Sequence, residues 1–120
     1  MNDNILSKKT LAFAIRIVKF VQHIQSKNKK EYILSNQVMR SGTSIGAHVR
    51  ETNFAQSKAD FIHKLSGAQK EANETEFWLI LLKEGGFITN EEFLSMQNDV
   101  IELLKILTAS ITTAKSKINK

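Results

Sequence analysis

The chain contains no cysteine and no proline, and only five of its 120 residues are glycine. The absence of cysteine excludes a disulfide framework and metal sites built from thiolates. Proline breaks helices and glycine weakens them, so their scarcity favours long helices over strands. A hydrophobic fraction of 42% is enough for one ordinary core. We therefore expect a single all-α domain over residues 1–120.

A long hydrophobic run is also missing. The longest apolar region, residues 11–24, is interrupted by Arg16 and Lys19, and it falls short of the ~20 apolar residues that span a bilayer. Polar Asn2, Asp3 and Asn4 precede the first apolar side chains, which is not the pattern of a secretory signal peptide. We therefore expect a cytoplasmic protein without a membrane partner.

Apolar residues recur at steps of three and four in four segments of the chain, which is the period of amphipathic helices. The helices are predicted at residues 4–26, 35–54, 57–85 and 89–118. Gly85 and Gly86 end the third helix, because glycine takes the left-handed conformation without steric cost. The connections between the helices are short. This pattern predicts an antiparallel, up-down-up-down four-helix bundle.

Three of the predicted helices begin with residues that can cap free backbone N–H groups. Ser35 is the predicted cap of the second helix. Ser57 with Asp60, and Thr89 with Glu92, have the spacing of capping boxes ahead of the third and fourth helices. These signals predict where the last three helices begin.

Two segments are more specific than a helical period. Residues 40–52 read Arg-Ser-Gly-Thr-Ser-Ile-Gly-Ala-His-Val-Arg-Glu-Thr, and residues 71–79 read Glu-Ala-Asn-Glu-Thr-Glu-Phe-Trp-Leu. They resemble runs on the second and third helices of the 23S rRNA intervening-sequence proteins, also called S23 ribosomal proteins. His48 stands where that family has Asn, and Thr52 where it has Ala. The resemblance covers nearly the whole chain.

The resemblance carries implications for assembly and partners. Members of the family are four-helix bundles associated with homo-pentameric rings and, through the ribosomal intervening sequence, with nucleic acid. The chain is also similar to the accessory protein of diversity-generating retroelements, which is thought to work beside a reverse transcriptase and its RNA. The resemblance therefore implies a pentamer, with RNA, DNA or a protein such as a reverse transcriptase as partner.

Gly42 and Gly46 lie within the predicted second helix, where each costs roughly 1 kcal/mol relative to alanine. Their spacing of four residues puts both on one face of the helix. One interpretation is a neighbouring helix or subunit that packs closely there. The other, a phosphate-cradling turn, is rejected because the segment lacks the Gly-Lys-Ser/Thr ending of a nucleotide-binding loop.

Residues 77–82 are six consecutive apolar residues at the end of the third helix. A run of this length covers every face of a helix, although each helix of a four-helix bundle keeps one side towards water. Burial by another subunit accounts for such a run, and an unusually buried helix end is the alternative. The residues expected at an oligomer interface are Phe77, Trp78, Ile80 and Leu81.

Positive charge is concentrated at the start of the chain. The net charge is +5, and residues 1–30 hold seven Lys or Arg against one Asp (7 − 1 = +6), which leaves −1 for the remainder. At 100° per residue, five cations share one sector of the first helix. They are Lys8, Lys9, Arg16, Lys19 and Lys27. This basic stripe predicts electrostatic binding of RNA or DNA, and no aromatic residue among the cations indicates sequence-specific readout. The alternative is a solvated face on a protein-interaction scaffold.

The titratable residues give no catalytic or metal-binding pattern. None of the three histidines has a Glu three residues earlier, as in the di-metal sites of helical bundles. Glu71 and Glu74 lie one turn apart and are suited to acid–base chemistry, but no sequence signal supplies a nucleophile or ligand. A structural ion pair with Arg40 or Arg50 is the favoured interpretation. The sequence therefore predicts a protein that is not an enzyme and has no metal or cofactor.

Overall fold

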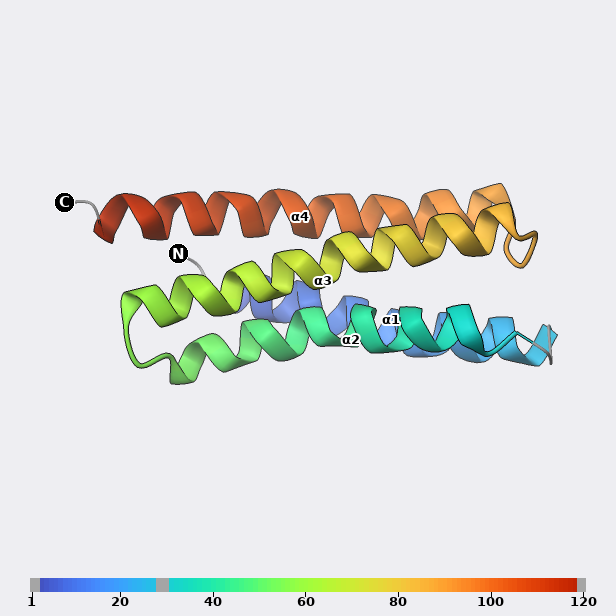
Figure 1. Ribbon diagram of the computed structural model, residues 1–120, viewed down its shortest axis with the longest axis horizontal. Coiled ribbons are helices and arrows are strands. Elements are labelled where there is room, and N and C mark those ends of the chain that lie inside the picture. Colours follow the sequence, from blue (N-terminus) through green and yellow to red (C-terminus); the bar gives the residue numbers. More distant parts are fainter. Residues whose placement is uncertain (1–2, 28–30, 119–120) are drawn as a thin grey trace.

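The computed structural model describes residues 3–27 and 31–118, and within them it consists of helices without strands. The four long helices are α1 (Asp3–Lys27), α2 (Ile33–Glu51), α3 (Lys58–Glu84) and α4 (Asn90–Ile118), and a short 3-10 helix, η1 (Thr52–Phe54), follows α2. Successive helices run in opposite directions (Figure 1). The predicted all-α arrangement of four antiparallel helices is confirmed.

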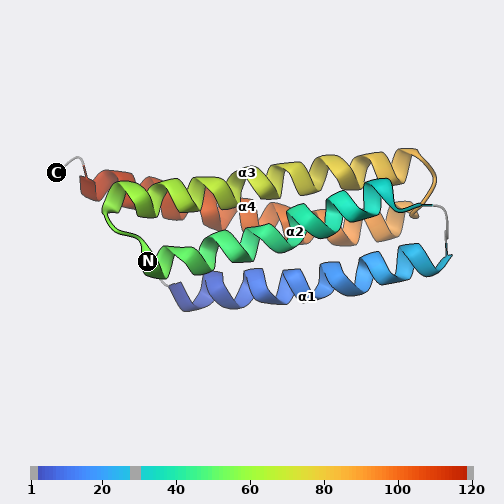
Figure 2. The ribbon, with the colours of Figure 1, turned by 60° about the horizontal axis from the view of Figure 1, so that its bottom comes forward.

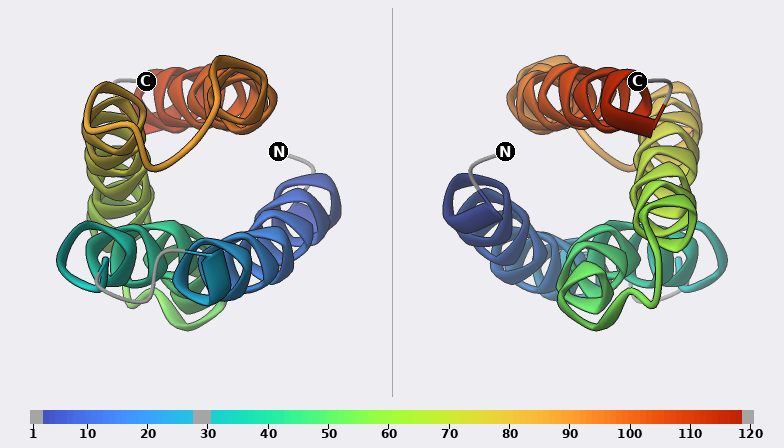
Figure 3. Two further views of the ribbon diagram at one scale, coloured as in Figure 1. Left: turned by 90° about the vertical axis from the view of Figure 1, so that its right-hand side faces the viewer. Right: turned by 90° about the vertical axis from the view of Figure 1, so that its left-hand side faces the viewer.

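The helices pack in chain order, so that α2 lies between α1 and α3 (Figure 2). The bundle measures 52 × 22 × 20 Å. Viewed along its length, it forms an open arc in which the ribbons of α1 and α4 stand apart (Figure 3). These two helices have the least contact of the four neighbouring pairs. The arc therefore closes between α1 and α4 through side chains rather than through close backbone packing.

The core is built from one apolar stripe on each helix. Its fully buried members include Ile17 on α1, Ile45 on α2, Leu79 on α3 and Leu107 on α4. The stripes follow the three- and four-residue steps of the sequence, so one face of every helix points inward. The opposite faces carry the charged residues from which any surface site must be made.

The turn between α3 and α4 follows the predicted chemistry. Gly86 has φ 81°, and its N–H donates to Lys83 O at 3.0 Å, while the N–H of Phe87 donates to Leu82 O at 2.9 Å. Thr89 N–H donates to Glu92 Oε1 at 2.8 Å, and Glu92 N–H donates to Thr89 Oγ1 at 3.0 Å. These bonds satisfy both helix ends and hold α3 and α4 antiparallel.

The start of α2 differs from the prediction. Ser57 caps α3 as expected, accepting the N–H of Asp60 at 3.0 Å, but α2 begins at Ile33 rather than at Ser35. The Glu31 carboxylate Oε1 accepts the N–H groups of Leu34 at 2.6 Å and of Ser35 at 2.9 Å. Its side chain is long enough to reach these N–H groups from before the helix, which leaves Ser35 buried inside the first turn.

Candidate nucleic-acid interface

The five cations of the predicted basic stripe fall into two groups in the structure. Lys9 and Arg16 turn towards α4, where Lys9 Nζ lies 2.9 Å from Glu102 Oε1 and Arg16 Nη1 lies 2.5 Å from Asp99 Oδ2. Lys8, Lys19 and Lys27 are exposed and have no ion-pair partner among the described residues. A sector of about 100° on a helix is wide enough to border a neighbour on one side and solvent on the other.

Three ion pairs follow one another along the α1–α4 seam, which is the surface where the charged side chains of these two helices meet. Below the contacts of Lys9 and Arg16, His23 Nε2 lies 3.2 Å from Glu92 Oε2. Arg16 also donates to the Ser95 carbonyl and hydroxyl oxygens. Exposed pairs of this kind contribute about 0–1 kcal/mol each. The seam therefore joins α1 to α4 weakly and neutralises much of the charge on this side of α1.

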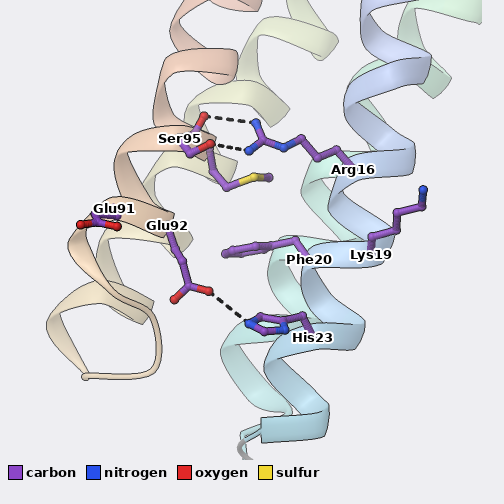
Figure 4. Close-up of a pocket in the computed structure, with 8 residues that line it drawn as sticks. Arg16, Lys19, Phe20, His23, Glu91, Glu92 and Ser95 are labelled. Carbon is purple, nitrogen blue, oxygen red and sulfur yellow. Dashed lines mark hydrogen bonds and ion pairs between the residues drawn. The ribbon is translucent and has the colours of Figure 1, made fainter.

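A shallow pocket of about 440 Å³ opens in the α1–α4 seam. Figure 4 shows the ring of Phe20 projecting towards α4 between the contacts of Arg16 and His23, while the Lys19 side chain points away from α4. The backbone N–H of Thr89 lowers the pKa of Glu92 by hydrogen bonding, and the charges of His23 and Lys27 lower it further. The carboxylate of Glu92 thus serves the helix cap and the seam together.

A second charged cluster joins α2 to α3. Arg40 lies 3.3 Å from Glu71 and 2.9 Å from Glu74. The hydrogen bond with Glu74 raises the pKa of Arg40. Arg50 does not join this cluster, because it follows Arg40 by ten residues and therefore lies about 15 Å further along the helix. Arg50 instead lines a groove between α1 and α2.

Both glycines of α2, Gly42 and Gly46, face α1. A methyl group on Gly42 would lie 2.7 Å from Ile17 Cγ1, and one on Gly46 would lie 3.3 Å from the Thr10 carbonyl oxygen. A third close approach was not predicted: a methyl group on Gly67 of α3 would lie 2.9 Å from His48 Nδ1. The signal available in the sequence was a glycine in the middle of a long helical pattern.

The apolar end of α3 is partly exposed. Phe77 is 55% and Ile80 39% exposed, whereas Trp78 packs against the core and Leu81 is half-buried. The Phe77 and Trp78 rings meet edge-to-face with centroids 5.3 Å apart. On α4, Leu94 and Ile101 are also exposed. Their spacing of seven residues, about two helical turns, indicates in the sequence that they share one face of the helix. We call Phe77, Ile80, Leu94 and Ile101 the α3–α4 apolar surface.

Two classes of site were tested on the described residues alone. Within residues 3–27 and 31–118, no three His, Asp or Glu side chains are grouped to hold a metal ion. No helix in the same part of the chain is long and apolar enough to cross a membrane.

Comparison with known proteins places the chain in a family. The family model described as 23S rRNA-intervening sequence protein matches residues 2–109. A crystal structure of a protein with unknown function from the S23 ribosomal protein family of Bacteroides thetaiotaomicron is 49% identical, and the match covers 93% of this chain and 99% of that one with a TM-score of 0.89. No curated protein matches the chain. The chain belongs to the 23S rRNA-intervening sequence protein family.

Proposed function

We propose that the protein is a non-enzymatic, homo-oligomeric helical bundle that binds RNA or DNA electrostatically through the outer face of α1. The observation that carries this proposal is that two exposed cations of α1, Lys8 and Lys19, have no carboxylate partner among the described residues, whereas the charge of the third unpaired cation, Lys27, acts on Glu92. Lys9 and Arg16, by contrast, are already paired with α4. The unpaired lysines therefore attract phosphates without first breaking an ion pair.

Oligomerisation supplies the affinity that two lysines per subunit lack. The α3–α4 apolar surface leaves Phe77 and Ile80 exposed on α3, and exposed apolar surface of this kind favours a subunit contact. We propose a homo-pentamer, following the family resemblance. In such an assembly each subunit contributes a few phosphate contacts, and linked weak contacts add up to useful avidity.

The test of the proposal compares two charge reversals of equal size. Lys8→Glu with Lys19→Glu is expected to abolish retention of single-stranded RNA at low salt. Lys58→Glu with Lys105→Glu changes the net charge by the same amount at exposed positions on α3 and α4, and it is expected to keep most of the binding. Equal losses in the two variants would show that binding depends on net charge and not on the outer face of α1.

A protein-interaction scaffold is the second candidate, and the α3–α4 apolar surface favours it. In this case the apolar residues bind another protein, such as a reverse transcriptase, and the free lysines of α1 are only solvated. Phe77→Asp distinguishes the two uses, because an unpaired charge in a desolvated contact costs several kcal/mol. Dissociation of the oligomer in light scattering would identify the surface as a subunit contact. An unchanged mass would favour the scaffold.

A further inference from the structure

The groove between α1 and α2 is separate from the α1–α4 seam and has a volume of about 390 Å³. Ser7, Lys8, Thr10, Leu11 and Ala14 line it from α1, and Thr43, Gly46, Ala47, Arg50 and Asn53 line it from α2 and η1. At Gly46 the backbone of α1 approaches closely, since a methyl group there would lie 3.3 Å from the Thr10 carbonyl oxygen. Because α1 and α2 run in opposite directions, Ser7 and Lys8 lie at the same end of the groove as Arg50 and Asn53.

The charge of this groove is positive and uncompensated. Lys8 and Arg50 line it, no acidic residue does, and neither cation has an ion-pair partner among the described residues. The other two arginines of the chain each bind carboxylates: Arg16 binds Asp99, and Arg40 binds Glu71 and Glu74. Glu51, next to Arg50 in the sequence, instead faces Lys64 of α3 at 3.5 Å.

The spacing of the α2 residues matches a binding face. Thr43, Gly46, Ala47 and Arg50 are separated by three, one and three residues, so they share one side of the helix. All four belong to residues 40–52, and the Arg50 side chain forms no ion pair with another described residue. An exposed guanidinium beside a groove without acidic residues is suited to hold an anion, because no carboxylate of the groove competes for it.

We propose that the α1–α2 groove binds a phosphate group, held by the planar fork of the Arg50 guanidinium and by the Lys8 ammonium. A tetrahedral phosphate presents anionic oxygens on several sides, so it can meet cations from both walls, whereas a carboxylate presents two oxygens at one end. The Ser7 hydroxyl and the Asn53 amide, both at the groove, can donate further hydrogen bonds. This inference rests on the proposed function where the phosphate belongs to RNA or DNA, and it stands apart from it where the source is a free phosphate.

The experiment uses the full chain with two probes, single-stranded RNA and inorganic pyrophosphate. Arg50→Gln removes the fork, and Lys19→Gln removes one exposed cation of α1 that does not line the groove. We expect Arg50→Gln to weaken RNA binding about tenfold, because charge-assisted hydrogen bonds are the strong ones. Lys19→Gln should weaken it less. Pyrophosphate should raise the melting temperature of the wild-type protein and not that of Arg50→Gln. Circular dichroism and light scattering check that both variants keep their helicity and mass.

The outcomes separate the groove from the proposed function. Suppose that Lys19→Gln weakens RNA binding as much as Arg50→Gln does, and that pyrophosphate raises the melting temperature of neither the wild-type protein nor Arg50→Gln. The groove proposal is then overturned while the proposed function stands. If the wild-type protein binds no RNA but pyrophosphate protects it through Arg50, the proposed function fails and the groove binds a small phosphate. If Arg50→Gln changes neither readout, the groove is not a phosphate site.

Discussion

Helix α1 meets its two neighbours in opposite ways. Against α2 it packs closely, since a methyl group on Gly42 would overlap the Ile17 side chain and one on Gly46 would press against the Thr10 backbone. Against α4 it is held by polar side chains, such as Arg16 with Asp99. Both contacts lie along the same 25-residue helix. Close packing therefore lies on the side of α1 that faces α2, and charged contacts lie on the side that faces α4.

The two contacts also respond to different conditions. Close apolar packing depends on shape and is insensitive to salt, whereas exposed ion pairs are screened within a Debye length of about 8–10 Å at physiological salt. We therefore expect substitutions in the α1–α2 contact to change stability by much more than those in the α1–α4 seam. The predictions that follow run from the largest expected effect to the smallest.

Gly42→Ala should give the largest loss. The added methyl group would lie 2.7, 2.9 and 3.0 Å from Cγ1, Cδ1 and Cγ2 of the fully buried Ile17, so the whole branched side chain would have to shift. Overpacking of this kind costs typically 1–3 kcal/mol, and it outweighs the gain of up to about 1 kcal/mol in helix propensity. Urea unfolding measures the difference. Ser44→Ala, which removes an exposed hydrogen bond from the Ser44 hydroxyl to Arg40 O on the same helix, serves as the control, and a Gly42→Ala variant more stable than the wild type would contradict the close contact.

Acid should weaken the cap of α4, and with it the α1–α4 seam, through Glu92. Because the folded-state pKa of Glu92 lies below its ordinary value of 4.5, its contribution to stability is present above pH 4.5 and is lost as the pH falls through the lower folded value. Glu92→Gln keeps an acceptor for the capping box but does not titrate. The free energy of unfolding of this variant should therefore depend less on pH below 4.5 than that of the wild type. Identical pH profiles would exclude this role of Glu92.

The ion pair of Lys9 with Glu102 should give the smallest effect. Both side chains are about half exposed, at 43% and 58%, and double-mutant cycles on such pairs give about 0.2–1 kcal/mol. We expect a coupling in this range for Lys9→Ala with Glu102→Ala, and a decrease as salt is added. A coupling as large as the cost of Gly42→Ala would remove the contrast between the two sides of α1.

The parts of the fold that could be predicted are those determined by neighbouring residues in the sequence. The helical period, the capping boxes at Ser57 and Thr89 and the glycine turn all act over a few residues. The start of α2 was misplaced because the long Glu31 side chain caps the helix from outside it. A search for short capping residues at the first apolar position does not find such a cap.

The site was harder to predict because it depends on which helices are neighbours. A helical wheel places Lys9 and Lys8 in one sector but does not show that α4 lies on one side of it, with Glu102 opposite Lys9. Likewise, the sequence offers Arg40 and Arg50 as equal candidates for an ion pair with Glu71 and Glu74. In the structure Arg40 faces α3 and forms this pair, whereas Arg50 lies in the groove beside α1. Both distinctions come from tertiary packing, which residue spacing along one helix does not encode.

The most direct test of the central claim is the binding of single-stranded RNA by the wild-type protein across a range of salt concentrations, followed by fluorescence anisotropy. If unpaired cations on the outer side of α1 contact phosphates, the logarithm of the affinity should fall linearly with the logarithm of the salt concentration, with a slope of about −0.7 for each phosphate contacted. Lys8→Glu with Lys19→Glu should remove that binding. A wild-type protein that shows no binding even at the lowest salt would contradict the claim and leave the outer face of α1 as a solvated surface.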